Sequence, residues 1–246
     1  MTLRALIFDV DGTLAETEEL HRAAFNAAFR AAGLRWHWSR DAYGALLTTT
    51  GGKERIRRYI TETGAGEVDV AALHAEKTAH YTALVAKGAL ELRPGIRALM
   101  AMGRAAGVRL AVATTTSRLN VEALCHACFN APAEAIFDVL ACGDEVAAKK
   151  PAPDIYLLAL DRLGLPADAA LAFEDTPMGV ASAQGAGMRV VASPGVYSQD
   201  ADLSRAERRV ECFSDLIDGG LAALQARRSP VNGSSARLSG NTTRSA

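Results

Sequence analysis

The sequence has no long apolar run and almost no excess charge. No stretch approaches the roughly 18 to 20 apolar residues of a membrane-spanning helix, and residues 1–6 lack the long apolar region of a signal peptide. Lys and Arg number 27 and Asp and Glu 28, so the net charge is −1. This balance offers no broad basic surface to nucleic acid or to an anionic membrane. We therefore predict a cytoplasmic monomer with neither kind of partner.

Cysteine is also scarce. The four residues in this chain of 246 are too few and too unevenly spaced for a disulfide framework. Cys125 and Cys128 have the spacing of half a zinc site, but no second ligand pair follows them. Reduced thiols with a structural role are therefore predicted.

Short apolar segments recur along the chain and are separated by amphipathic segments of helix length. The first, Leu3 to Phe8, stops abruptly at Asp9, and similar segments follow at 108–113, 136–140, 169–173 and 188–192. Short, wholly apolar segments are typical of buried parallel strands. The alternation predicts an α/β fold with a doubly wound, Rossmann-like parallel sheet.

Residues 16–90 interrupt this alternation. Their apolar residues recur at helical spacing, and Pro94 then stands where a helix can begin. We predict a discontinuous core, 1–15 and 91–225, with a helical cap inserted at 16–90. Trp36 and Trp38 are expected to pack between cap helices. Residues 226–246 hold few large apolar side chains and are expected to form a disordered tail.

Polar residues stand directly after four of the predicted strands. Parallel strands end at the same edge of a sheet, and open α/β folds bind ligands there, so these side chains are expected to meet. They are Asp9 and Asp11 after the first strand, Thr114, Thr115 and Thr116 after the second, Lys149 and Lys150 after the third, and Glu174 and Asp175 after the fourth.

Acids packed this closely require a cation, because unpaired carboxylates repel one another and raise their own pKa values. Hard oxygen ligands indicate Mg²⁺, which typically takes one or two carboxylates and a substrate phosphate. A lysine and the Thr114 hydroxyl would then bind the phosphate oxygens. The position directly before Pro151 favours Lys150, and Lys149 is the alternative.

Asp9 and Asp11 can take different parts in phosphate-ester hydrolysis. Gly12 permits a sharp turn at the end of the strand, so the two carboxylates need not share a face. One acid can attack phosphorus to form an aspartyl phosphate, while the other protonates the leaving oxygen and then activates water. These residues predict a Mg²⁺-dependent phosphatase that acts on a small phosphorylated metabolite.

The same residues resemble the motifs of the haloacid dehalogenase-like hydrolase superfamily, and the inserted cap is similar to that of its β-phosphoglucomutase-like subfamily. The resemblance implies that Asp9 is the nucleophile and Asp11 the acid/base. It implies that Mg²⁺ is held by the Asp9 carboxylate, the Asp11 backbone carbonyl and Asp175, assisted by Glu174. The matching segments are Asp9-Val10-Asp11-Gly12-Thr13-Leu14, Thr114, Lys150-Pro151 and Glu174-Asp175.

Segments 16–21, 48–55 and 113–117 resemble the CbbY branch of that subfamily. This branch dephosphorylates xylulose 1,5-bisphosphate, an inhibitory by-product of Rubisco in carbon fixation, to xylulose 5-phosphate and phosphate. Gly51 and Gly52 before two cations also indicate an anion-binding loop. The resemblance implies that the sugar and its second phosphate contact Glu16, His21, Lys53, Arg55, Thr116, Ser117 and Arg118. Gly51, Gly52 and Thr115, which adjoin them, are also predicted to bind the substrate.

Ordinary structural roles compete with several of these assignments. Glu174 can be structural, because Asp175 alone completes a Mg²⁺ site. Glu16 can favour the first turn of a helix through its charge. His21 can be a packed helix residue, and Lys53 and Arg55 can belong to a solvated helix face.

Three rival functions remain at this point. A sugar-phosphate mutase would return the phosphoryl group to a sugar instead of to water. A broad sugar-phosphate phosphatase would share the chemistry without the selectivity. A non-catalytic sugar-phosphate-binding module would keep the fold without turnover, although the presence of Asp9, Asp11 and Asp175 argues against it.

Overall fold

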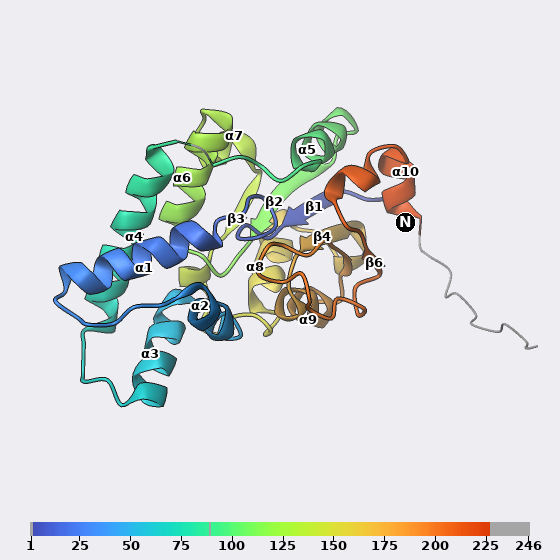
Figure 1. Ribbon diagram of the computed structural model, residues 1–246. Coiled ribbons are helices and arrows are strands. Elements are labelled where there is room, and N and C mark those ends of the chain that lie inside the picture. Colours follow the sequence, from blue (N-terminus) through green and yellow to red (C-terminus); the bar gives the residue numbers. More distant parts are fainter. Residues whose placement is uncertain (1, 89, 227–246) are drawn as a thin grey trace, which may run out of the picture.

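A six-stranded parallel sheet runs through the centre of the computed structural model (Figure 1). The structure describes residues 2–88 and 90–226. The strand order is β3-β2-β1-β4-β5-β6, which is that of a doubly wound sheet. In such sheets the ligand site lies beyond the carboxyl ends of the strands where the order reverses, here between β1 and β4. The strands are β1 (Ala5–Phe8), β2 (Arg109–Ala113), β3 (Val139–Ala141), β4 (Ala170–Glu174), β5 (Arg189–Ala192) and β6 (Arg208–Arg209).

Helices cover both faces of the sheet (Figure 1). Side chains alternate along β1, so Leu6 and Phe8 enter one apolar core and Ala5 and Ile7 enter the other. Burial on both faces explains why the strands are almost wholly apolar. The first face carries α5 (Ile96–Ala105), α6 (Arg118–Phe129), α7 (Ala133–Ile136), η3 (Phe213–Leu216) and α10 (Gly220–Gln225), and the second carries α8 (Asp154–Leu163) and α9 (Pro177–Gly185).

Two short 3₁₀ helices complete the core. One, η1 (Gly143–Glu145), follows β3, and the other, η2 (Ala167–Ala169), leads into β4. At the start of α9 the Thr176 hydroxyl accepts a hydrogen bond from the Gly179 amide, and Pro177 occupies the first turn. Both features are typical of a helix N-terminus, so α9 begins directly after the polar end of β4.

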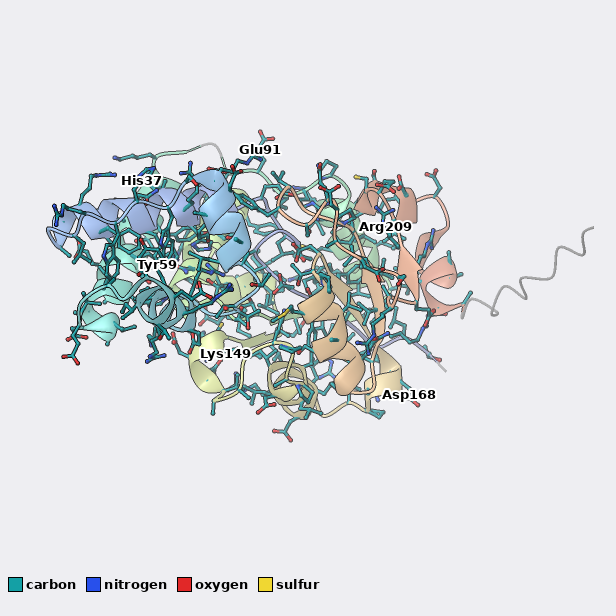
Figure 2. All side chains as sticks on the ribbon, turned by 60° about the horizontal axis from the view of Figure 1, so that its bottom comes forward. His37, Tyr59, Glu91, Lys149, Asp168 and Arg209 are labelled. Carbon is teal, nitrogen blue, oxygen red and sulfur yellow. The ribbon has the colours of Figure 1, made fainter. Side chains whose placement is uncertain are left out.

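Between β1 and α5 the described residues form four helices. The chain leaves and re-enters the core side by side, because Ala15 forms an antiparallel bridge with Leu92. Figure 2 places His37 and Tyr59 in this insert, at the opposite end of the molecule from Asp168 and Arg209. The inserted helices are α1 (Glu18–Ala31), α2 (Arg40–Leu46), α3 (Gly52–Thr63) and α4 (Val70–Ala86).

The insert has its own apolar core. Phe25 and Phe29 of α1 pack on Trp38 with ring centroids 4.6 and 4.8 Å away, and Trp36 lies edge-on to Phe29 at 5.4 Å. The two tryptophans follow α1 and pack within the insert, as expected. Ser39 and Asp69 cap α2 and α4 through side-chain hydrogen bonds to backbone amides.

The predicted α/β sheet with a helical insert is confirmed, with two differences in its strands beyond shifts of one or two residues at their ends. The third strand begins at Val139 and not at Ile136, because Ile136 closes the short helix α7. The two-residue strand β6 was not predicted, since Arg208 and Arg209 lack the apolar character of a buried strand and lie at the sheet edge. Apart from Ala226, the predicted tail lies outside the described residues.

Two further expectations can be compared with the structure. All four cysteines are free thiols. Among the helices of residues 2–88 and 90–226, none is both long and apolar enough to cross a membrane.

Gly95 and Gly107 provide a matched test of core packing. Both have a positive φ, of 91° and 71°, but a Cβ on Gly95 would lie 2.2 Å from the Ser214 amide nitrogen, whereas one on Gly107 would have open space. We expect Gly107→Ala to cost about 1 kcal/mol of unfolding free energy from backbone strain, and Gly95→Ala to cost at least about 2 kcal/mol more from collision with η3. Urea denaturation measures both, and equal losses would contradict the predicted collision.

Candidate active site

Three acids meet at the carboxyl ends of β1 and β4. Asp9 follows β1, Glu174 ends β4 and Asp175 comes next, and one carboxylate oxygen from each lies within 4.8 Å of the others. All three side chains are buried. The sheet supplies this geometry, because β1 and β4 are hydrogen-bonded neighbours that end at the same level.

Lys150 brings a positive charge into this group. Its ammonium lies 2.6 Å from Asp9 Oδ1 and 2.6 Å from Glu174 Oε1. The adjacent Lys149 points elsewhere and donates to the carbonyl oxygens of Gly143 and Val146. The structure therefore places Lys150, and not Lys149, at the acids.

Gly12 lets the chain turn closely around Asp175. Its φ is 82°, and a Cβ on it would lie 2.2 Å from Asp175 Oδ2, so no other residue fits without displacing the acid. The hydroxyls of Thr13 and Ser198 donate to the two oxygens of Asp175 at 3.3 and 3.4 Å. Asp175 is thus oriented by neighbours from both sides.

Burial and neighbouring negative charges raise the pKa values of two acids. Burial, together with the charges of Glu174 and Asp11, raises the pKa of Asp9 to about 7, although Lys150 opposes the shift. Burial and the charges of Asp9 and Glu174 raise the pKa of Asp175 well above its usual range. A bound cation would reverse both shifts, and an all-oxygen donor set suits a hard metal ion. The residues present therefore fit a metal ion.

Glu174 is engaged mainly with its neighbours. Its Oε1 accepts hydrogen bonds from Lys150 and from the Tyr156 hydroxyl, both at 2.6 Å, and its Oε2 accepts from the Asp175 amide at 3.3 Å. In this arrangement Glu174 anchors Lys150 while remaining close enough to contribute to a metal site.

The Asp11 side chain faces the helical insert instead of the other acids. Its Oδ1 accepts hydrogen bonds from Thr17 Oγ1 at 2.5 Å and from His21 Nε2 at 2.9 Å. Burial alone would raise the pKa of Asp11, but His21 and Thr17 outweigh it and hold the pKa well below its usual range. Asp11 is therefore held as a carboxylate, the form that accepts a proton.

Lys77 on α4 sets the protonation of His21. Its ammonium donates to His21 Nδ1 at 2.7 Å, so the neutral ring carries its proton on Nε2 and donates it to Asp11. Burial and the charge of Lys77 lower the pKa of His21 and keep the ring neutral. Tyr81 stacks on this ring at 4.0 Å and fixes its plane.

A cavity of about 270 Å³ lies between the strand ends and the insert. It is lined by nearly every residue that the sequence analysis proposed for substrate binding. The core contributes Thr114, Thr115, Thr116 and Ser117, and the segment after β1 and the insert contribute Glu16, His21, Gly51, Gly52, Lys53 and Arg55.

Some of these lining residues already have partners. Lys53 pairs with Asp144 at 3.3 Å across the mouth of the cavity. Glu16 accepts from the Val196 amide at 3.1 Å and lies 3.3 Å from Arg93. His21 contacts Asp11 and Lys77, so in this structure its side chain orients the Asp11 carboxylate.

Other lining groups have no partner among the described residues. These buried atoms are Arg55 Nε on the insert and Ser117 Oγ and Asn120 Oδ1 at the start of α6. All three residues line the cavity and have hydrogen-bonding capacity that the described residues do not use, which suits a cavity for a polar ligand.

Arg118 is a prediction that the geometry does not support. Its guanidinium pairs with Glu134 on the surface and is not among the groups that line the cavity. Arg118 is the first residue of α6 and directly follows the N-cap residue Ser117. Adjacent residues at a helix start point in different directions, so Arg118 does not share the orientation of Ser117.

Sequence reasoning missed several residues of the site. Lys77 and His74 on α4, Asn120 on α6 and Tyr156 on α8 lie in or beside the cavity. None follows a strand or belongs to a recognised motif. Each lies within a helix, and polar helix residues usually face solvent. Only the helical spacing from Ser117 to Asn120, which puts both on one face of α6, offered a signal.

The fold and this site define the class of protein. The sequence model of the haloacid dehalogenase-like hydrolases matches residues 3–187, and the chain belongs to this family of enzymes. The predicted membership is therefore confirmed, and so is the prediction of a haloacid dehalogenase-like phosphatase.

The relatives of this chain include CbbY proteins, the branch that the sequence motifs resembled. The chain is 53% identical over 224 residues to protein CbbY of Cereibacter sphaeroides, covering 90% of this chain and 96% of the relative. It is 55% identical over 216 residues to protein CbbY of Rhodobacter capsulatus, covering 87% and 95%. A crystal structure of a variant CbbY from Rhodobacter sphaeroides in complex with xylulose 1,5-bisphosphate superposes with a TM-score of 0.86 at 52% identity, covering 92% of this chain and 100% of that one.

The lowered pKa of Lys77 predicts that the unfolding free energy depends on pH. Burial lowers the pKa of this lysine from 10.5 to about 8. Between these values the unfolded state binds the proton and the folded state does not, so the unfolding free energy should rise with pH. From pH 8 to 10 we expect the wild type to gain about 2 kcal/mol relative to Lys77→Met.

Urea denaturation at both pH values measures this difference. Lys87→Met, which removes an exposed lysine just after α4, is the matched control and should follow the wild type. The same pH dependence in the wild type and in Lys77→Met would show that Lys77 has an ordinary pKa.

Proposed function

We propose that this chain is a Mg²⁺-dependent sugar-phosphate phosphatase that converts xylulose 1,5-bisphosphate to xylulose 5-phosphate and phosphate through an aspartyl phosphate. The observation that carries the proposal is the buried group of Asp9, Glu174, Asp175 and Lys150 at one end of a cavity whose other walls hold unpartnered polar atoms. The CbbY complex with this bisphosphate supports the choice of substrate.

Asp9 is the proposed nucleophile. Its carboxylate attacks phosphorus, the bond to the sugar oxygen breaks, and a phosphoryl group is left on Asp9. Lys150, 2.6 Å from Asp9, favours the ionised form of this carboxyl group and pairs with the oxygens of the transferring group. Thr114, buried in the cavity wall, donates its hydroxyl to the same oxygens.

Asp9, Asp175 and the backbone carbonyl of Asp11 would hold Mg²⁺, with Glu174 beside them. The ion supplies positive charge to the phosphoryl oxygens. Asp175 is kept in place for this task by Thr13 and Ser198.

Asp11 is the proposed acid/base. The His21 and Thr17 hydrogen bonds hold it as a carboxylate, ready to take a proton from the water that attacks the aspartyl phosphate. Asp11 keeps that proton until the first half of the next turnover, when it gives the proton to the leaving sugar oxygen. Lys77 and His21 keep the side chain pointed toward the cavity in both halves.

The far end of the cavity is assigned to the sugar and its second phosphate. Ser117 and Asn120 lie at the N-terminus of α6, where the helix dipole favours an anion. Arg55 faces the cavity from the insert with an unpartnered Nε. Ordering these groups with the Gly51–Gly52 loop would select a bisphosphate over a monophosphate.

The insert is proposed to act as a cap. We assign residues 16–90 to a cap that closes over the sugar and excludes bulk water, and 1–15 with 91–225 to the core that performs the chemistry. A monomer in the cytoplasm, with neither nucleic acid nor membrane as partner, stays a prediction.

Release of inorganic phosphate from a panel of sugar phosphates tests the reaction. With Mg²⁺ we expect strong preference for xylulose 1,5-bisphosphate over ribulose 1,5-bisphosphate and over sugar monophosphates. Asp9→Asn should lower kcat by roughly 10³-fold or more, because it removes the nucleophile. The matched control is Asp161→Asn on the exposed surface of α8, which should stay within about twofold of wild type.

Each rival function gives a different result. Comparable release from many monophosphates would indicate a broad phosphatase. With β-glucose 1-phosphate and a bisphosphate primer, isomerised product without free phosphate would indicate a mutase. Binding without any turnover would indicate a binding module, and each of these outcomes would contradict the proposed reaction.

Metal binding has its own test. We expect Mg²⁺ binding, measured by titration calorimetry, to weaken about tenfold or more in Asp175→Asn, because one anionic ligand is lost. Asp144→Asn, which alters an acid at the cavity mouth, should bind Mg²⁺ as the wild type does. Unchanged binding in Asp175→Asn would exclude this residue as a ligand.

A further inference from the structure

The segment between β5 and β6 contacts both the acids and the helical insert. At one end of residues 193–198, the Ser198 hydroxyl donates to Asp175 Oδ2 at 3.4 Å and accepts from the Gly195 amide at 2.8 Å. Gly195 is packed so closely that a Cβ on it would lie 3.2 Å from the same carboxylate oxygen. The position of this segment is therefore linked to that of Asp175.

The same segment is fastened to α1. The Tyr197 hydroxyl donates to Glu19 Oε1. Arg40 of α2 lies over the Tyr197 ring, 5.5 Å from its centroid, and its Nε is 3.5 Å from Glu19 Oε1. The Val196 amide adds a second hydrogen bond, to Glu16 just before α1. A core segment and two inserted helices are thus joined at one point.

Tyr197 also touches the residues that hold Arg55. Its ring meets Tyr43 of α2 edge-on, with centroids 5.7 Å apart at 85°. The Tyr43 hydroxyl accepts from Arg55 at 3.0 Å and donates to Glu18 at 2.6 Å, and the Arg55 guanidinium lies 5.1 Å from the Tyr43 ring centroid. One chain of contacts therefore runs from Asp175 through Ser198, Tyr197 and Tyr43 to Arg55.

The Tyr197 hydroxyl is suited to this connection. Burial and the hydrogen bond to Glu19 raise the pKa of Tyr197 to about 12, so the hydroxyl remains a donor. Burial acts the other way on Glu19, but hydrogen bonds from Tyr197 and Arg22 lower its pKa, so it remains a charged acceptor. A hydrogen bond to an ionised partner is stronger than a neutral one.

We propose that Tyr197 is a positioning residue that holds Arg55 of the insert at a fixed distance from Asp175 of the core, and so favours substrates with two separated phosphates. This inference rests on the proposed phosphatase function. It differs from that function in assigning part of the substrate selectivity to a residue outside the catalytic motifs.

The test compares two substrates in one variant. Tyr197→Phe keeps the ring and removes only the hydroxyl that reaches Glu19. For xylulose 1,5-bisphosphate we expect KM to rise about tenfold with kcat little changed, since the loss of a hydrogen bond to a charged group loosens the insert. For para-nitrophenyl phosphate, which carries one phosphate and no sugar, the rise in KM should stay below about threefold.

Two further variants separate positioning from general stability. Tyr59→Phe removes a hydroxyl from a ring of the insert that packs on Trp36 and Trp38, and should leave both KM values unchanged. Glu19→Gln keeps an acceptor for Tyr197 and should be milder than Glu19→Ala, which keeps none. Equal effects of Tyr197→Phe on both substrates, or of Glu19→Gln and Glu19→Ala, would overturn the proposal.

Hydrogen exchange provides a readout that does not need turnover. In Tyr197→Phe, amides of α2 and of residues 193–198 should exchange about tenfold faster together, whereas Tyr59→Phe should leave 193–198 unchanged. No change in either segment would refute the connection. If the wild type releases no phosphate from either compound, the proposed function fails, and the exchange result still decides whether Tyr197 joins core and insert.

Discussion

The buried contact of Lys150 with Asp9 and Glu174 is the interaction on which the site depends. Three buried carboxylates lie close together, and their charges would repel without positive charge among them. A buried ion pair adds little net stability, because desolvation costs as much as the attraction returns. The apolar sheet supplies the stability instead, and its strand ends hold the acids close together despite their mutual repulsion.

Asp9 and Asp11 show how one short segment acquires two kinds of acid. They are two residues apart, yet burial among other acids raises the pKa of Asp9, while His21 and Thr17 lower that of Asp11. Separating two carboxylates by environment is how one site assigns different chemical roles to the same residue type. Here Asp9 lies among residues of the core, whereas Asp11 contacts Thr17 and His21 of the insert, so the two parts of the chain shift the two pKa values in opposite directions.

Much of this arrangement could be read from the chain. Apolar segments that stop at Asp9 and before Glu174 predicted both the strands and the place where the polar side chains meet, because parallel strands end together. The sequence was misleading at positions where contacts made in the folded protein, and not the local residue pattern, set the structure. Ile136 looked like part of a strand but closes a helical turn, and Arg118 follows the cavity residues Ser117 and Thr116 yet pairs with Glu134 outside it.

The sequence by itself determined the strand ends, the helical insert and the identity of the clustered acids, since each depends on local periodicity and on the order of residues along the chain. The tertiary structure alone decided that Lys77 reaches His21 from a helix 56 residues away, and that Tyr197 reaches Glu19 across 178 residues. These contacts depend on how α4 and the segment after β5 pack against α1. Packing of that kind is set by the whole fold and leaves no periodic signal in the sequence.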